Sequence, residues 1–145
     1  MRTADVVVIG GGIHGCSTAL HLALRGLKPI LVEKDYAGRH ASGVNAGGVR
    51  QLARDLAEIP LSISSMSLWE RIEELVGDDC GFVSHGTVLV AENETELASF
   101  RARVDDLRLR GFTHEELIDR AELKRLVPAV ADHCPGGVVS RRDGA

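Results

Sequence analysis

Aromatic residues, prolines and cysteines are all scarce in this sequence. Three phenylalanines, one tyrosine, one tryptophan and four prolines occur in 145 residues. The three cysteines, Cys16, Cys80 and Cys134, are odd in number, far apart and in no CxxC pair. The sequence therefore predicts neither a disulfide framework nor a metal site, and we expect a reducing, cytoplasmic location.

Long apolar runs and long basic runs are also missing. The apolar stretch near the N-terminus is interrupted by Asp5, four glycines and two histidines, so we expect neither a signal peptide nor a transmembrane segment. Seventeen basic residues against twenty-one acidic ones give a net charge of −4. Without a basic stretch to neutralise phosphates, nucleic acid is not an expected partner. The composition is that of a soluble globular chain.

The first third of the chain has the pattern of a βαβ unit. Residues 4–9 form a continuous apolar run, which predicts a strand buried on both faces of a parallel sheet. From Ile13 the apolar residues recur at helical spacing, and Gly26 is placed to end that helix. A second apolar run, residues 29–33, predicts the next strand. The expected fold class is therefore α/β and Rossmann-like.

The remainder of the chain changes character twice. Residues 35–50 contain four glycines and little periodicity, so they predict a long loop, and a loop of this length usually has a function. A helix is then expected over residues 63–75, as far as Gly77. We place the domain boundary there, with residues 1–77 as part of one domain and residues 78–145 as the beginning of an α+β domain.

The second part begins with an expected strand over residues 82–91, bent at Gly86. Asn93, with Glu96 three residues later, resembles a capping box and opens an expected helix. Asp119 and Glu122 repeat this signature before a shorter helix.

Three glycines carry the clearest chemical signal. Gly10, Gly12 and Gly15 match GxGxxG directly after a predicted strand and at the start of a predicted helix. The first permits a tight turn, the second lets the backbone approach a diphosphate, and the third lets helix and strand pack closely. Glu33 ends the second strand, where a carboxylate can accept hydrogen bonds from ribose hydroxyls. The sequence therefore predicts a dinucleotide site.

This fingerprint does not by itself distinguish FAD from NAD. A nicotinamide domain usually continues with a short connection into further βα units, whereas here residues 35–50 follow. A backbone of small residues can lie along an extended dinucleotide and reach its redox ring. We therefore expect FAD, and a NAD-dependent dehydrogenase remains a less favoured alternative.

The motifs DVVVIGGGIHG, ILVEK and ASGVNAGGVR occur in the order and spacing of a known family, and GFVSHGTVLVAENETELA is similar to its first substrate-domain segment. The sequence thus resembles the FAD-dependent amine and amino-acid oxidoreductases, which include D-amino-acid oxidase, glycine oxidase and sarcosine oxidase. The resemblance covers the whole chain and is most specific over residues 5–50. It implies that Arg50 faces the flavin or a substrate carboxylate, although an exposed loop arginine is equally compatible with the sequence. The expected cofactor-binding residues are Gly10, Gly12, Ile13, His14, Gly15, Glu33 and Lys34, followed near the flavin by Ser42, Asn45, Ala46, Gly47 and Gly48.

The resemblance also implies the reaction. Such enzymes oxidise the C–N bond of an amine or amino acid by hydride transfer to flavin, and the electron acceptor is oxygen or a carrier. It implies a small-molecule substrate and leaves room for a partner subunit. Because the family continues beyond the equivalent of Ala145, we expect this chain to be an N-terminal fragment. A catalytically silent fragment that at most binds nucleotide is the alternative from a different class.

Overall fold

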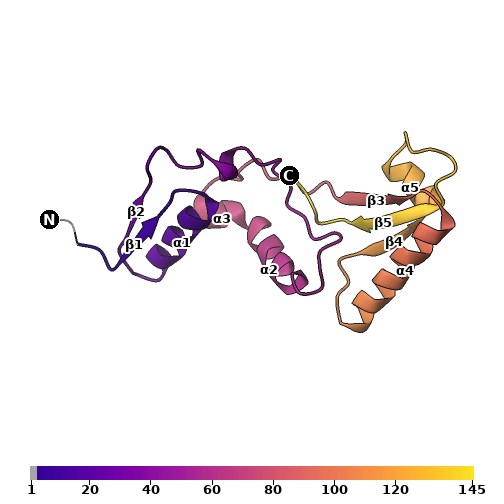
Figure 1. Cartoon of the computed structure of the whole chain (residues 1–145), viewed down its shortest axis with the longest axis horizontal. Helices are drawn as coiled ribbons and strands as arrows, with labels where there is room; N and C mark the ends of the chain where they lie inside the picture. Colours follow the sequence, from indigo (N-terminus) through magenta and orange to yellow (C-terminus); the bar gives the residue numbers. More distant parts are fainter. Residues whose placement is uncertain (1–2) are drawn as a thin grey trace. The chain divides into compact units, whose positions relative to one another are not determined.

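The structure is a computed structural model that describes residues 3–145. Contacts within the chain divide it into two compact units, one reaching to Gly47 and one from Gly48 to Ala145, and each is described by itself. Figure 1 labels the helices and strands of both units. A contact unit is not the same as a functional domain, so the domain boundary expected at residue 77 stays a prediction.

The first unit contains the expected βαβ arrangement. Strand β1 (Val6–Ile9) leads into helix α1 (Ile13–Leu24), which returns to strand β2 (Pro29–Val32). The two strands pair in parallel, with Val6 opposite Pro29 and Ile9 opposite Val32. Helix α1 lies beside this pair (Figure 1). The short 3-10 helix η1 (Ala41–Gly43) interrupts the loop that follows.

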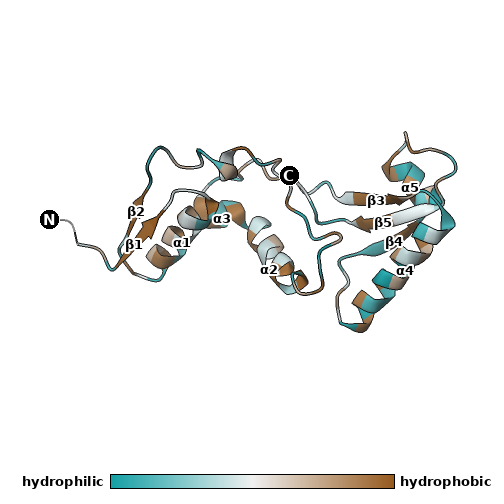
Figure 2. Ribbon diagram, in the orientation of Figure 1, coloured by the Kyte–Doolittle hydropathy of each residue, from teal (hydrophilic) through white to brown (hydrophobic). Residues whose placement is uncertain are grey.

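The prediction that the first strand is buried on both faces is wrong for this chain. Val6 and Val8 are partly buried, whereas Val7 is 59% and Ile9 88% exposed. The reason is that α1 covers one face of a two-stranded sheet, and alternate side chains of a strand point to opposite faces. Figure 2 shows the apolar colouring of β1 and β2.

The second unit begins with two helices where the sequence predicted one. Helix α2 (Ile59–Trp69) stops before Arg71, whose φ of −121° and ψ of 24° are not helical, and α3 (Ile72–Val76) follows. At this break Glu70 makes two hydrogen bonds to Arg142, and Trp69 packs against Phe82 with ring centroids 5.5 Å apart. Contacts distant in sequence therefore interrupt the helical pattern.

An antiparallel sheet forms the centre of the second unit. Strands β3 (Thr87–Ala91), β4 (Glu116–Asp119) and β5 (Gly136–Ser140) are arranged in the order β3-β5-β4. Helix α4 (Glu94–Leu109) lies along this sheet (Figure 1), and α5 (Arg120–Leu126) follows β4 directly. The sequence predicted β3, although with a longer range, but neither β4 nor β5.

The central strand β5 separates two apolar clusters. Val138 packs with Leu52 and Val104, whereas Val139 packs in a cluster that includes Ile118 and Leu123. A Cβ atom added to Gly136 or Gly137 would lie 2.4 or 2.3 Å from a carbonyl oxygen of a neighbouring strand. Glycine therefore brings the neighbouring strands close at this end of β5, and apolar side chains at its other end fill both faces.

Side-chain caps open both helices of the second part, as the sequence predicted. Asn93 Oδ1 accepts from Glu96 N at 3.0 Å at the start of α4, and Asp119 Oδ1 accepts from Glu122 N at 2.9 Å at the start of α5. Each cap satisfies an amide that the helix itself leaves without an acceptor.

Candidate cofactor-binding site

A tight glycine turn connects β1 to α1. Gly10 has a φ of +105°, a conformation that side chains other than glycine rarely adopt. Its amide donates to Val32 O at 2.8 Å, which fixes the turn to the end of β2. The first glycine of the fingerprint therefore stands where the backbone requires glycine.

Gly15 lies against the same turn. A Cβ atom at this position would be 1.8 Å from the carbonyl oxygen of Gly10, closer than any real contact. The first turn of α1 can approach the end of β1 only because this side chain is absent.

Ser42 occupies a place beside the first turn of α1. Its Oγ accepts a hydrogen bond from Ile13 N at 2.9 Å, and a Cβ atom on Gly12 would lie 3.0 Å from the same oxygen. Within the first unit, the structure thus brings Ser42 to the glycine turn. The sequence had grouped Ser42 with the flavin end of the cofactor, and a role of Ser42 at either end remains a prediction.

Glu33 contacts the turn from the end of β2. Its Oε2 accepts from Gly11 N at 2.6 Å, and its Oε1 accepts from Asp35 N at 3.1 Å. The hydrogen bond from Gly11, followed by that from Asp35, holds the pKa of the Glu33 carboxyl below its ordinary value. The carboxylate is therefore ionised near neutral pH. Two of its four lone-pair sites remain for other donors.

Several amides at this turn are not used by the protein. Within residues 3–145, the N–H groups of Gly12, His14 and Gly15 have no hydrogen-bond acceptor, whereas Ile13 N is bonded to Ser42. They belong to the N-terminal end of α1, where the helix dipole favours negative charge. Unpaired donors in a turn without side chains fit the diphosphate of a dinucleotide, and Glu33 beside them fits a ribose.

The rest of the glycine-rich loop folds back on this turn. Gly38 N donates to Gly11 O at 2.9 Å, so Gly38 and the buried Gly11 join the site although the sequence analysis did not name them. Asn45 closes the loop locally, because its side chain bonds to Ser42 O and accepts from Gly47 N at 2.6 Å. Ala46, Gly47 and Lys34 are exposed.

Gly48 and Arg50 belong to the second unit. Arg50 is exposed, and its neighbours Val49 and Gln51 are bonded to Gly144 and Asp143. The roles predicted for Gly48 and Arg50 stay predictions.

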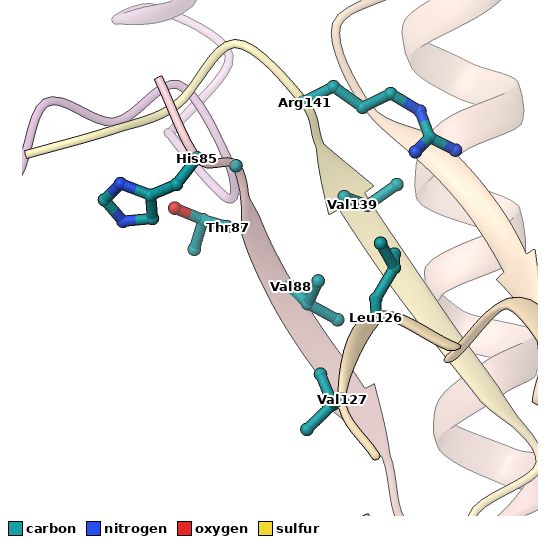
Figure 3. Close-up of a pocket in the computed structure, with 8 residues that line it drawn as sticks. His85, Thr87, Val88, Leu126, Val127, Val139 and Arg141 are labelled. Atoms are coloured by element: carbon teal, nitrogen blue, oxygen red, sulfur yellow. The ribbon is translucent and has the colours of Figure 1, made fainter. Parts of the chain in front are cut away.

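The second unit also has a hollow of its own, of about 450 Å³. Val88, Val127 and Val139 line its apolar part, with His85 and Arg141 at the rim (Figure 3). Arg141 is already paired with Glu116 at 2.9 Å and with Glu122 at 3.2 Å. The hollow therefore offers no uncommitted charge and no grouping of acid, base and nucleophile.

Two further searches covered residues 3–145. No three side chains among histidine, cysteine, aspartate and glutamate come together there in a way that could hold a metal ion. None of the helices in that range is both long enough and apolar enough to cross a lipid bilayer.

Comparison with known proteins places the chain in a family. The profile of the FAD dependent oxidoreductase family (DAO) matches residues 5–145. The beta subunit of sarcosine oxidase from Rhizobium meliloti is 29% identical over 97% of this chain and 35% of its own length. Gamma-glutamylputrescine oxidoreductase from Escherichia coli is 32% identical over 94% of this chain and 36% of its own length. The chain thus spans about a third of these relatives.

Solved structures agree with this assignment. L-Amino acid deaminase from Proteus myxofaciens, solved with anthranilate, superimposes with a TM-score of 0.89 at 25% identity, over 100% of this chain and 33% of that one. L-Proline dehydrogenase from P. horikoshii gives a TM-score of 0.84 at 27% identity, over 99% of this chain and 38% of that one. An L-alpha-glycerophosphate oxidase from Mycoplasma pneumoniae with FAD bound gives 0.74 at 25% identity, over 100% of this chain and 39% of that one.

The choice between FAD and NAD, which the glycine fingerprint left open, is decided by these matches in favour of FAD. A glycine turn with unpaired amides, an ionised glutamate beside it and a family profile over almost the whole sequence all agree: the chain belongs to the FAD dependent oxidoreductase family.

Proposed function

We propose that this chain binds the ADP half of FAD at its glycine turn and forms part of an enzyme that oxidises the C–N bond of an amine or amino acid. The observation that carries the proposal is the set of unpaired amides at Gly12, His14 and Gly15, beside Glu33, in a member of an FAD-dependent family. Sarcosine, gamma-glutamylputrescine and amino acids occur in the names of similar proteins, which supports this substrate class.

Each residue of the turn has a proposed task. The amides of Gly12, His14 and Gly15 bind the diphosphate, and the Ser42 hydroxyl, which accepts from Ile13 N, donates its own proton to a phosphate oxygen. Glu33 accepts from ribose hydroxyls through its remaining lone pairs, and its charge disfavours a 2′-phosphate. Ile13 and Lys34 flank these contacts.

The following loop has a proposed role toward the redox ring. Asn45, Ala46, Gly47 and Gly48 present backbone groups without bulky side chains, and Arg50 supplies a cation for a substrate carboxylate. When bound, FAD supplies a ring that accepts a hydride from the carbon next to the substrate nitrogen. The protein orients the substrate and excludes competing reactions. The electron acceptor is oxygen or a carrier.

The domain division and the partners are part of the same proposal. Residues 1–77 contribute to the FAD domain and residues 78–145 to the substrate domain, which is supported by the change from parallel pairing in β1 and β2 to antiparallel pairing beyond residue 77. Two of the similar proteins, one of a sarcosine oxidase and one of an opine oxidase, are named as subunits, which supports a partner subunit for the enzyme.

Binding of FAD tests the proposal directly. Titration with FAD, followed by quenching of flavin fluorescence, is expected to give one site per chain, and Gly10→Ala is expected to abolish it. Gly26→Ala is the matched control, because Gly26 also has a positive φ (+82°) but follows the far end of α1. Equal FAD affinity in the two variants would refute the site.

A second candidate is a chain that binds nucleotide without turnover. It is favoured by the exposed apolar side chains of Val7, Ile9 and Val32, which leave part of the first unit uncovered. Stoichiometric FAD binding with no reduction of the bound flavin by any of glycine, sarcosine, L-proline or putrescine would support this candidate. Bleaching of the visible flavin absorbance by one of these amines in the absence of oxygen would refute it.

A further inference from the structure

Three consecutive amides in the second unit donate to buried carboxylates. Gln51 N and Leu52 N donate to the two oxygens of Asp143, at 2.8 and 3.1 Å, and Ala53 N donates to Glu115 Oε1 at 2.9 Å. This segment, residues 51–53, precedes α2 and contains no helix or strand. Its backbone position is therefore set by side chains from distant parts of the sequence.

Both carboxylates are committed to this segment. Asp143 is 0% and Glu115 2% exposed, and a buried carboxylate is costly unless donors satisfy it. Asp143 accepts a further hydrogen bond from Ser140 Oγ at 2.8 Å and makes no ion pair within residues 3–145. Two of the donors that offset the burial of Asp143 are thus the amides of Gln51 and Leu52.

Glu115 is held by a cation as well. Arg103 donates to both of its oxygens at 2.8 Å, and the same guanidinium donates to Arg54 O at 2.8 Å. Burial raises the pKa of Glu115, but the hydrogen bonds from Arg103 and Ala53 and the charge of Arg103 outweigh it, so that the pKa lies below its ordinary value. Ala53 has a φ of +56°, an uncommon conformation that this contact helps to hold.

The other side of Arg50 is fixed too. Val49 and Gly144 exchange two backbone hydrogen bonds, both at 2.9 Å. A Cβ atom on Gly144 would lie 2.2 Å from Val83 O, so glycine alone allows this approach. Arg50 therefore stands between two anchored neighbours, Val49 and Gln51.

The side chain of Arg50 is in contrast uncommitted. It is exposed, and its guanidinium makes no hydrogen bond or ion pair within the described part of the chain. Only its carbonyl is used, as the acceptor of a 3.2 Å hydrogen bond from Arg54. A guanidinium on an anchored backbone can bind a carboxylate through two parallel hydrogen bonds while losing little backbone freedom.

We propose that Asp143 and Glu115 are positioning residues that hold Arg50 ready for the carboxylate of an amino-acid-like ligand. The inference rests on the proposed function for its choice of ligand. Neither residue touches the ligand. Their role is to restrict the backbone on the C-terminal side of Arg50, so that the guanidinium is presented in one orientation.

Anthranilate is a suitable probe, because it is the molecule bound in the similar deaminase from Proteus myxofaciens. Aniline has the same ring and amine without the carboxylate and serves as the matched ligand. Isothermal titration calorimetry would compare the wild-type protein, saturated with FAD, with Asp143→Asn, Arg50→Ala and the double variant. Glu70→Gln, at an exposed ion pair of the same unit, is the control variant.

We expect Asp143→Asn to weaken anthranilate binding about tenfold, because the amide group of asparagine cannot accept from Leu52 N and the segment loosens. Aniline binding and Glu70→Gln should show no change. In the Arg50→Ala background the second substitution should have no further effect, since both act through one guanidinium.

Three outcomes would overturn the inference: additive losses in the double variant, an equal loss for aniline, or a wild-type protein that ignores anthranilate. Should Asp143→Asn fail to fold, Glu115→Gln carries the same test at Ala53. FAD content is measured first from absorbance, and its absence refutes the proposed function alone. The anthranilate titrations are then read on the protein without FAD.

Discussion

Ser42 Oγ lies 2.9 Å from Ile13 N, so a side chain of the glycine-rich loop already satisfies the first amide of α1. A hydroxyl can donate and accept at the same time. With its lone pair directed at Ile13, the Ser42 proton remains available to a phosphate oxygen. The loop and the turn are thereby parts of one anion site.

Ser42→Ala should weaken FAD binding about fivefold, which corresponds to the loss of about 1 kcal/mol for one hydrogen bond. Equilibrium titration of FAD fluorescence measures the change. Ser64→Ala, on an exposed position of α2, provides the control. Unchanged or tighter binding in Ser42→Ala would show that the hydroxyl only competes with the phosphate for Ile13 N.

Gly15→Ala is expected to destabilise the protein by about 2 kcal/mol or more, because the added methyl group meets Gly10 O and the turn must move. At an unhindered helical position the same change would stabilise by up to about 1 kcal/mol. Urea denaturation distinguishes the two by the sign of the change. A more stable variant would show that α1 and β1 are not in close contact at this point.

Glu122 makes stability depend on acid. Its ion pairs with Arg125 and Arg141 lower its pKa from 4.5 to about 2, so its contribution is complete above pH 4.5 and is lost as the pH falls toward 2. The difference in unfolding free energy between wild type and Glu122→Gln should therefore be constant near neutral pH and vanish in acid. Added salt should reduce it, since the network is exposed. A difference that grows below pH 4.5 would contradict the assignment.

The two kinds of carboxylate in the second unit should respond very differently to truncation. Glu115→Ala removes a buried partner of Arg103 and of Ala53 N and should cost about 2 to 4 kcal/mol. Asp106→Ala removes only an exposed i,i+4 pair with Arg110, worth about 0.5 kcal/mol or less. Thermal unfolding of both variants at pH 7 gives the comparison. Equal losses would mean that Glu115 is not buried in solution.

Local sequence signals predicted the local parts of this structure. The turn at Gly10, the close approach at Gly15, and the caps at Asn93 and Asp119 each depend on residues within a few positions, and the structure has all of them. The family assignment followed from the same short motifs, because a diphosphate site needs a particular backbone more than particular side chains.

Contacts distant in sequence were not predictable in this way. Strand β5 begins with Gly136 and Gly137, which weaken any strand signal and have a reason only when Ile118 O and Leu89 O lie against them. Likewise nothing near Gln51 indicates that its amide bonds to Asp143, 92 residues later. The place of Ser42 beside Ile13 depends on how a 16-residue loop folds, and no periodicity encodes that.

The order β3-β5-β4 has a consequence for how the protein is made. The middle strand is the last of these three to be synthesised, so neither β3 nor β4 has a neighbour to pair with until Ser140 has left the ribosome. The βαβ unit, in contrast, has both of its strands once Val32 has emerged. Nascent chains stalled at increasing lengths should therefore become resistant to protease first around α1, and around α4 only after Ser140 has emerged.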